Sequence, residues 1–222
     1  RSSDLADLFG ARMQRADLAR ARMEGAKLST ARMEGAALHK ARMEGAVLSG
    51  ARMEGAVLHE ARMEGADLAR ARMERAHLFG ARMEGANLSQ ARMEGAVLHE
   101  ARMAGAVLHK ARMEGANLIG ARMEGAFLLE ARMDTDTYFR AARLQRAAVK
   151  GVTVPPGILS PEQIATMFGD GSVILPDDLK PYRPNHWLED DLHWREDAQD
   201  WDDFEIEWRR WQREGDAYRP PV

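Results

Sequence analysis

Histidines at a regular spacing are the first residues in this sequence that could do chemistry. His39, His59 and His99 stand at equivalent positions of a repeated pattern, with Phe79 at the place between the last two. Imidazole nitrogens bind zinc and copper, but a protein zinc site normally holds its ion with three or four ligands. No carboxylate or Cys supports His39 and His59, and Phe79 interrupts the series. We therefore predict surface histidines and no metal site.

No other pattern in the chain is typical of catalysis. The glycines of GDGS at 169–172 lack the Lys, strand and helix of a phosphate-binding loop. The sequence contains no HExxH motif, no readable Ser-His-Asp spacing and no Cys among its 222 residues. Met recurs in every second pentad from Met13 to Met133, which could suggest copper, but an inward thioether is better explained as filling an interior. We predict a protein that is not an enzyme and has no cofactor.

Four aromatic side chains near the C-terminus could bind a partner. They are spaced by 3, 4 and 3 positions, which places them on one face of a helix, and they are Trp201, Phe204, Trp208 and Trp211. Because Trp is enriched in binding hot spots, these four are the predicted partner-binding residues. The partner would be another protein or a second copy of this chain. In the alternative, the helix folds back with its aromatic side against the rest of the molecule.

The element that must position these residues is a five-residue repeat. Ala occupies every fifth position from Ala6 to Ala131, and Leu or Met stands at the second position after each Ala. A period of five fits neither a helix nor a long strand. Ala and Leu or Met share one side of a short extended segment, and the positions that follow must turn the chain. Ten of the 13 Met pentads end in Gly, which supplies the positive φ of a tight turn.

Several pentads resemble the A(D/N)LXX motif of pentapeptide repeat proteins, namely ADLAR at 16–20 and 66–70, ANLSQ at 86–90 and ANLIG at 116–120. The resemblance extends over about residues 6–156. It implies an all-β solenoid, a right-handed quadrilateral β-helix with four pentads per coil and with Ala, Leu and Met inside. The Met pentads depart from the motif because their second residue is Arg.

The outward residues of the Met pentads predict a lattice of ion pairs, since Arg precedes Met and Glu usually follows it. Some members of the family protect DNA gyrase by imitating acidic DNA. Here residues 1–156 carry 25 Lys and Arg against 19 Asp and Glu, a net charge of +6, which disfavours that imitation. The charges are interleaved rather than gathered in one basic patch, so we predict no binding of nucleic acid.

The repeat breaks at 136–141, where a segment of six replaces a pentad, and we predict a bulge there with Tyr138 or Phe139 pointing inward. Residues 1–156 are predicted to form a β-helix of about 7.5 coils. Residues 157–222 are predicted to form a C-terminal capping helix near 160–168 and an α-helical, acidic and aromatic tail near 197–214. Phe127 and Leu129, which are apolar and outward, are predicted to receive this tail. The stretch 160–187 is similar to the tail of alphaproteobacterial pentapeptide repeat proteins.

These features favour a bacterial, non-catalytic structural scaffold or protein-interaction module on a rigid rod. Two alternatives remain open: a DNA-mimic regulator of DNA gyrase or topoisomerase, and the soluble domain of a protein whose membrane tether precedes Arg1. The lack of Cys is consistent with a cytoplasmic location, with membrane association only through such an upstream segment.

Overall fold

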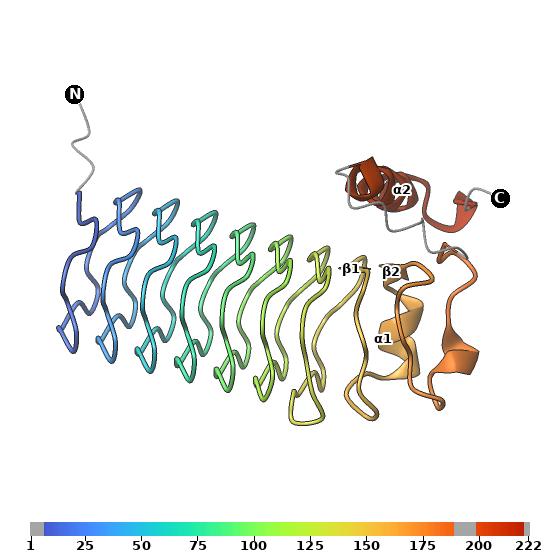
Figure 1. Ribbon diagram of the computed structural model, residues 1–222, viewed down its shortest axis with the longest axis horizontal. Helices are drawn as coiled ribbons and strands as arrows, with labels where there is room; N and C mark the ends of the chain where they lie inside the picture. The colour runs from blue at the N-terminus through green and yellow to red at the C-terminus, as the bar shows by residue number, and fades with distance from the viewer. Residues whose placement is uncertain (1–6, 189–198, 220–222) are drawn as a thin grey trace.

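The computed structural model describes residues 7–188 and 199–219, except for the side chains of residues 199–202 and 216. The described repeats form a rod of stacked coils, and the C-terminal elements gather at one end of it (Figure 1). No helix of this described part is long and apolar enough to cross a membrane.

Each coil contains four pentads, because parallel bridges join the second position of a pentad to the second position of the fourth pentad after it. Arg12 pairs with Arg32, and Arg32 pairs with Arg52. Each bridge has two hydrogen bonds, as where Met33 donates to Arg52 O at 2.7 Å and Arg52 donates to Ala31 O at 2.9 Å. One pentad of each coil therefore lies on each side of the rod, as the resemblance implied.

The interior is a continuous column of Ala, Leu and Met side chains. Every Ala, Leu and Met at the first and third pentad positions from Ala31 to Ala126 is 0% exposed. Met pentads and Leu pentads alternate, so two opposite sides of the rod are built by Met pentads and two by Leu pentads. We call these the methionine sides and the leucine sides. Burial of one Leu or Met contributes about 1.5–3 kcal/mol, and a coil obtains that burial only from its neighbours.

The corners between sides are tight turns. Ala46 donates its N–H to Met43 O at 3.0 Å, and Gly45 between them has a φ of 63°. On the methionine sides this corner residue is usually Gly, which adopts positive φ without strain. On the leucine sides other residues often occupy the same conformation, such as Lys40 with a φ of 59°. The hydrogen bonds between coils hold these residues in a conformation that costs about 1–2 kcal/mol for a side chain with Cβ.

One extra residue enters the repeat slightly earlier than predicted. Asn117 pairs with Tyr138, which is one position beyond the regular spacing, whereas Arg112 still pairs with Arg132 at that spacing. The insertion therefore lies in the corner before Thr137 rather than within 136–141. Thr137 takes the position of the inward Ala at 1% exposure, and its hydroxyl donates to Met113 O at 3.1 Å. Phe139 points inward at 1% exposure, whereas Tyr138 is 50% exposed.

The parallel ladder does not end at Pro156, where the sequence suggested a change of domain. Strand β1 (Ala148–Val149) pairs in parallel with β2 (Phe168–Gly169), and Thr153 pairs with Ile174. Helix α1 (Pro161–Ala165) lies in this last coil (Figure 1). It is shorter than the predicted 160–168 because Phe168 and Gly169 are needed for strand pairing.

Side chains close the C-terminal end of the rod. Ser160 and Gln163 form a capping box at α1, and Gln163 Nε2 also donates to Phe139 O and Ala142 O, both at 3.0 Å. Trp187 is 1% exposed and lies so close to Gly169 that a Cβ there would be 2.9 Å from its ring. A short 3-10 helix, η1 (Lys180–Tyr182), precedes Trp187. These contacts cover the carbonyls and apolar interior that an open coil would expose.

Candidate interaction surfaces

The tail helix α2 (Gln199–Glu214) packs beside the last coils, followed by the 3-10 helix η2 (Gly215–Ala217) (Figure 1). Phe204 is 0% and Trp208 5% exposed. The centroids of the Trp208 and Phe127 rings are 4.2 Å apart, and the indole N–H of Trp208 donates to Arg146 O at 2.9 Å. Leu129 belongs to the same buried cluster. The prediction that Phe127 and Leu129 receive the tail is thus confirmed.

The predicted partner-binding stripe therefore lies largely against its own rod. Trp211 is half-buried and stacks on His186, with ring centroids 4.8 Å apart and an angle of 11° between the planes. The side chain of Trp201 lies outside the described residues. Because a partner cannot reach side chains as buried as those of Phe204 and Trp208, their positions favour the alternative in which the helix folds back.

A buried ion pair lies beneath α2 and was not predicted. Lys150 Nζ is 3.2 Å from Asp170 Oδ2, and the two side chains are 5% and 0% exposed. Lys150 Nζ also lies 5.4 Å from the centre of the Phe204 ring, while Asp170 accepts a hydrogen bond from Ser172 N at 3.0 Å. The two residues are one coil apart, so the period of the stack was the signal that could have revealed them. The pair helps to position α2, since its lysine contacts an aromatic anchor of that helix.

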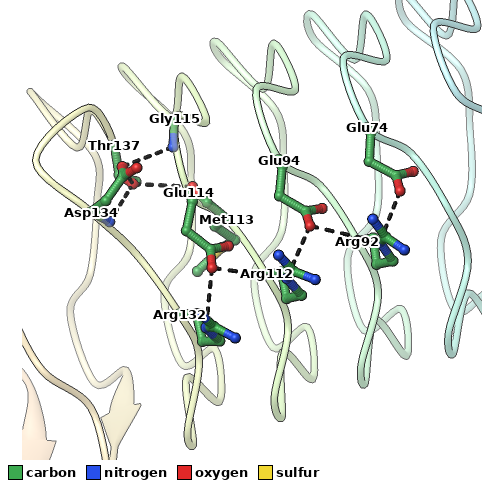
Figure 2. A network of polar contacts seen from close by, with 10 residues as sticks. All are labelled: Glu74, Arg92, Glu94, Arg112, Met113, Glu114, Gly115, Arg132, Asp134 and Thr137. Carbon is green, nitrogen blue, oxygen red and sulfur yellow. Dashed lines mark hydrogen bonds and ion pairs between the residues drawn. The ribbon is translucent and has the colours of Figure 1, made fainter.

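The methionine sides carry columns of ion pairs between successive coils, which confirms the predicted lattice. Arg112 Nε lies 2.9 Å from Glu94 in the preceding coil and 3.8 Å from Glu114 in its own coil (Figure 2). Asp134 ends this column, because its carboxylate accepts the Gly115 N–H at 2.9 Å. That hydrogen bond is the main cause that holds the pKa of Asp134 below its ordinary value, against the opposing effect of burial.

The opposite methionine side has one interruption. Arg102 Nε lies 2.6 Å from Glu84 in the preceding coil, but Ala104 stands where the next carboxylate would be. The ion pair of Arg122 on this side is with Glu124 of its own coil, at the longer distance of 3.6 Å. The charges on both methionine sides are mostly neutralised by one another, so neither side presents a strong field of one sign.

One leucine side, which we call the histidine face, carries His39, His59, His77 and His99 on its surface. The ring centroid of His59 is 5.8 Å from that of His77 and 6.3 Å from that of Phe79. Phe79 is 38% exposed and lies edge-on to His99 at 5.7 Å. The sequence suggested His39 and His59 as the neighbouring pair, whereas the ring contact found is between His59 and His77. Within 7–188 and 199–219, no three potential ligands of the His, Cys, Asp and Glu type are grouped for a metal.

One cavity beside α2 is lined by polar side chains that pair with the backbone around it. It has a volume of about 670 Å³ and lies between the last coil and α2, lined by residues that include Thr166, His186 and Trp211. The hydroxyl of Thr166 donates to Gln163 O at 2.9 Å, and His186 Nε2 lies 2.7 Å from Met167 O. Both groups thus complete the local backbone rather than form a nucleophile and base pair.

Comparisons with known proteins agree with this architecture. A family model described as pentapeptide repeats matches eight copies, with the matched residues at 6–45, 38–75, 56–95 and 76–115. The fold is similar to the crystal structure of HetL, a pentapeptide repeat protein involved in heterocyst differentiation regulation from the cyanobacterium Nostoc sp. strain PCC 7120. That match has a TM-score of 0.64 and 25% identity, and covers 78% of this chain and 81% of HetL.

A second similar fold is that of trypsin-treated QnrB1, a plasmid-mediated fluoroquinolone resistance protein. The TM-score is 0.50 and the identity 18%, over 79% of this chain and 87% of the QnrB1 chain. These likenesses imply a right-handed β-helix. A search of curated proteins found no match.

Proposed function

We propose that this chain, which belongs to the pentapeptide repeat family, is a non-catalytic scaffold that binds another protein through the surface of its rod. Members of the family are generally non-catalytic. The stacked coils provide a stiff support, because each one is hydrogen-bonded to its neighbours along its whole perimeter. The proposal assigns binding to the histidine face rather than to the aromatic stripe of α2.

The exposure of Phe79 is the observation that carries this assignment. Phe79 is 38% exposed in the middle of the histidine face, between the rings of His59 and His99. Aromatic side chains that remain exposed on a rigid surface are typical anchors of protein interfaces. The methionine sides are less suited to this role, because their charged groups already pair within the chain. On the other leucine side, α2 covers Phe127 and Leu129.

Photocrosslinking tests the assignment. A benzoylphenylalanine introduced at position 79 should form adducts with another protein in cells of the source organism. The matched control carries the same group at position 69, which is the equivalent corner position of the opposite leucine side. Adducts at 79 but not at 69 support the proposal, and their masses distinguish a foreign partner from a second copy. Equal labelling at both positions, or none at 79, contradicts it.

A role as a DNA-mimic regulator of DNA gyrase is the second candidate, and its support is the family resemblance. The likeness to QnrB1 concerns the fold alone. The net charge of +6 over residues 1–156 and the paired Arg and Glu columns are unfavourable for imitating a polyanion. Protection of purified gyrase in a supercoiling assay would favour this candidate over the scaffold, and no protection at micromolar protein would remove it.

The location in the cell is also a proposal. We place the rod in the cytoplasm, with a membrane tether upstream of Arg1 as the alternative. Fractionation of the source cells, followed by detection of the rod in the soluble or the membrane fraction, separates the two.

A further inference from the structure

Two imidazoles from adjacent coils meet on the histidine face. His77 stands beside Val57 in the parallel ladder, and His59 lies just after Val57 on the same surface. The two ring centroids are 5.8 Å apart, with 36° between the planes. The rings of Phe79 and His59 lie nearly perpendicular, with 83° between their planes and centroids 6.3 Å apart, so an aromatic neighbour limits the position of His59.

This separation matches two imidazoles that share one metal ion. A metal about 2.0–2.1 Å from an imidazole nitrogen lies about 3.2 Å from the ring centroid, so two rings on one ion have centroids about 4.5–6.4 Å apart as the angle at the metal opens from about 90° to 180°. The observed 5.8 Å lies within that interval. The site requires rotation about the side-chain bonds to aim a nitrogen of each ring at the ion, while the stacking of the coils sets the spacing of the two residues.

We propose that His59 and His77 form a binding site for a late first-row divalent ion, of the class of Cu²⁺, Ni²⁺ and Zn²⁺. Imidazole is a preferred ligand for these ions, and Cu²⁺ binds most tightly in that series. The surface position leaves the remaining coordination places to water, so the site is open and exchangeable rather than a closed structural centre. His59 and His77 belong to adjacent coils, so the ion links two turns of the rod.

The rest of the histidine face provides matched controls. His39 occupies the same position as His59, one coil earlier. The residue of the next coil that neighbours His39 is Val57, whereas the corresponding neighbour of His59 is His77. His99 likewise has Asn117 at that place. The pairing is thus specific to one step of the stack. His77→Val introduces the residue that both neighbouring coils carry at this position, Val57 and Val97, so the variant keeps the local packing.

Titration of the tag-free protein with Cu²⁺ at about pH 7.5, where imidazole is mostly neutral, tests the proposal. Electron paramagnetic resonance should show a Cu²⁺ species with two nitrogen ligands. Calorimetry should show that His59→Ala and His77→Val each weaken this binding at least about tenfold, while His39→Ala leaves it within about twofold. Loss of the same size in His39→Ala, or unchanged binding in His77→Val, overturns the proposal.

A second measurement separates this bridge from scattered binding to single histidines. Zn²⁺ should raise the melting temperature of the wild-type protein, because an ion bound only by the folded state stabilises that state. In His77→Val the rise should disappear. A rise of equal size in wild-type protein and His77→Val contradicts a bridge between the two coils.

Discussion

The methionine sides and the leucine sides of the rod have the same interior and different surfaces. Met63 and Leu68 are both 0% exposed, and the same ladder of hydrogen bonds runs under both. On each methionine side the outward residues are nearly invariant, with one Arg and one Glu from most coils. On the leucine sides they change from coil to coil, from Lys27 to His77 to Phe127. The difference indicates that the methionine sides hold the stack together, while the leucine sides carry the contacts specific to this chain.

The largest effect is expected where a leucine side receives the tail. Trp208→Ala should reduce the stability of α2 docking by about 3–5 kcal/mol, because a buried ring and its hydrogen bond to Arg146 are lost. Urea unfolding followed by circular dichroism should then show an early transition for α2 before the rod unfolds. Ile206→Ala is the control, since Ile206 is 56% exposed and lies on the same helix. A single unchanged transition in Trp208→Ala would contradict the docking.

Truncation of an inward side chain should lower the free energy of unfolding by a similar amount on a methionine side and on a leucine side. Leu78→Ala and Met73→Ala each remove a fully buried side chain and should lower the free energy of unfolding by about 2–5 kcal/mol. Urea denaturation of both variants measures this. A loss under only one kind of side would show that the interiors are not equivalent and would break the comparison.

Substitutions at and near Ala104 test how much the ion pairs of the methionine sides contribute to the free energy of unfolding. Ala104→Glu should place a carboxylate next to Arg122 and raise the free energy of unfolding by about 0.5–1 kcal/mol. Glu84→Ala should lower it by a similar amount, because Arg102 then loses its partner at 2.6 Å. Both changes should shrink in about 1 M NaCl, which screens exposed pairs. If both variants had the same free energy of unfolding as the wild type in low salt, the ion-pair columns would contribute nothing to the stability of the stack.

The smallest effect concerns acid and the end of one ion-pair column. The folded state holds the pKa of Asp134 below its ordinary value, so this carboxylate stabilises the fold above the unfolded pKa, and the contribution is lost as the pH falls through the folded pKa. Asp134→Asn should therefore be less stable than wild type at about pH 7, and the difference should shrink at about pH 2. Urea unfolding at both pH values measures it. A difference of the same size at both pH values would assign the effect to something other than charge.

Much of the fold could be predicted from the sequence because its period is local. Ala, with Leu or Met at the second position after it, defines the inward positions, and the Gly at the corner defines the turn. The extra residue before Thr137 was placed slightly too late, since the sequence does not show which residue of a corner is absorbed. The short length of α1 was missed because Phe168 and Gly169 pair with a strand of the preceding coil.

The site was harder to predict, since it depends on contacts between segments that the period does not join. The aromatic spacing of Phe204, Trp208 and Trp211 correctly indicates a helix face, but it does not say what that face touches. The apolar outward residues Phe127 and Leu129 supplied that information. The contact of His59 with His77 was missed because the two residues occupy different pentad positions, and only the stacking of coils brings them together.

The division of roles between the sides is tested most directly by one pair of double variants measured by urea unfolding. His77→Asn with Phe79→Ser copies the outward residues Asn87 and Ser89 onto the histidine face. Arg72→Ala with Glu74→Ala removes one step of an ion-pair column. We expect the first variant to keep the wild-type free energy of unfolding within about 0.5 kcal/mol and the second to lose about 1 kcal/mol or more. A larger loss in the first variant than in the second would contradict the account.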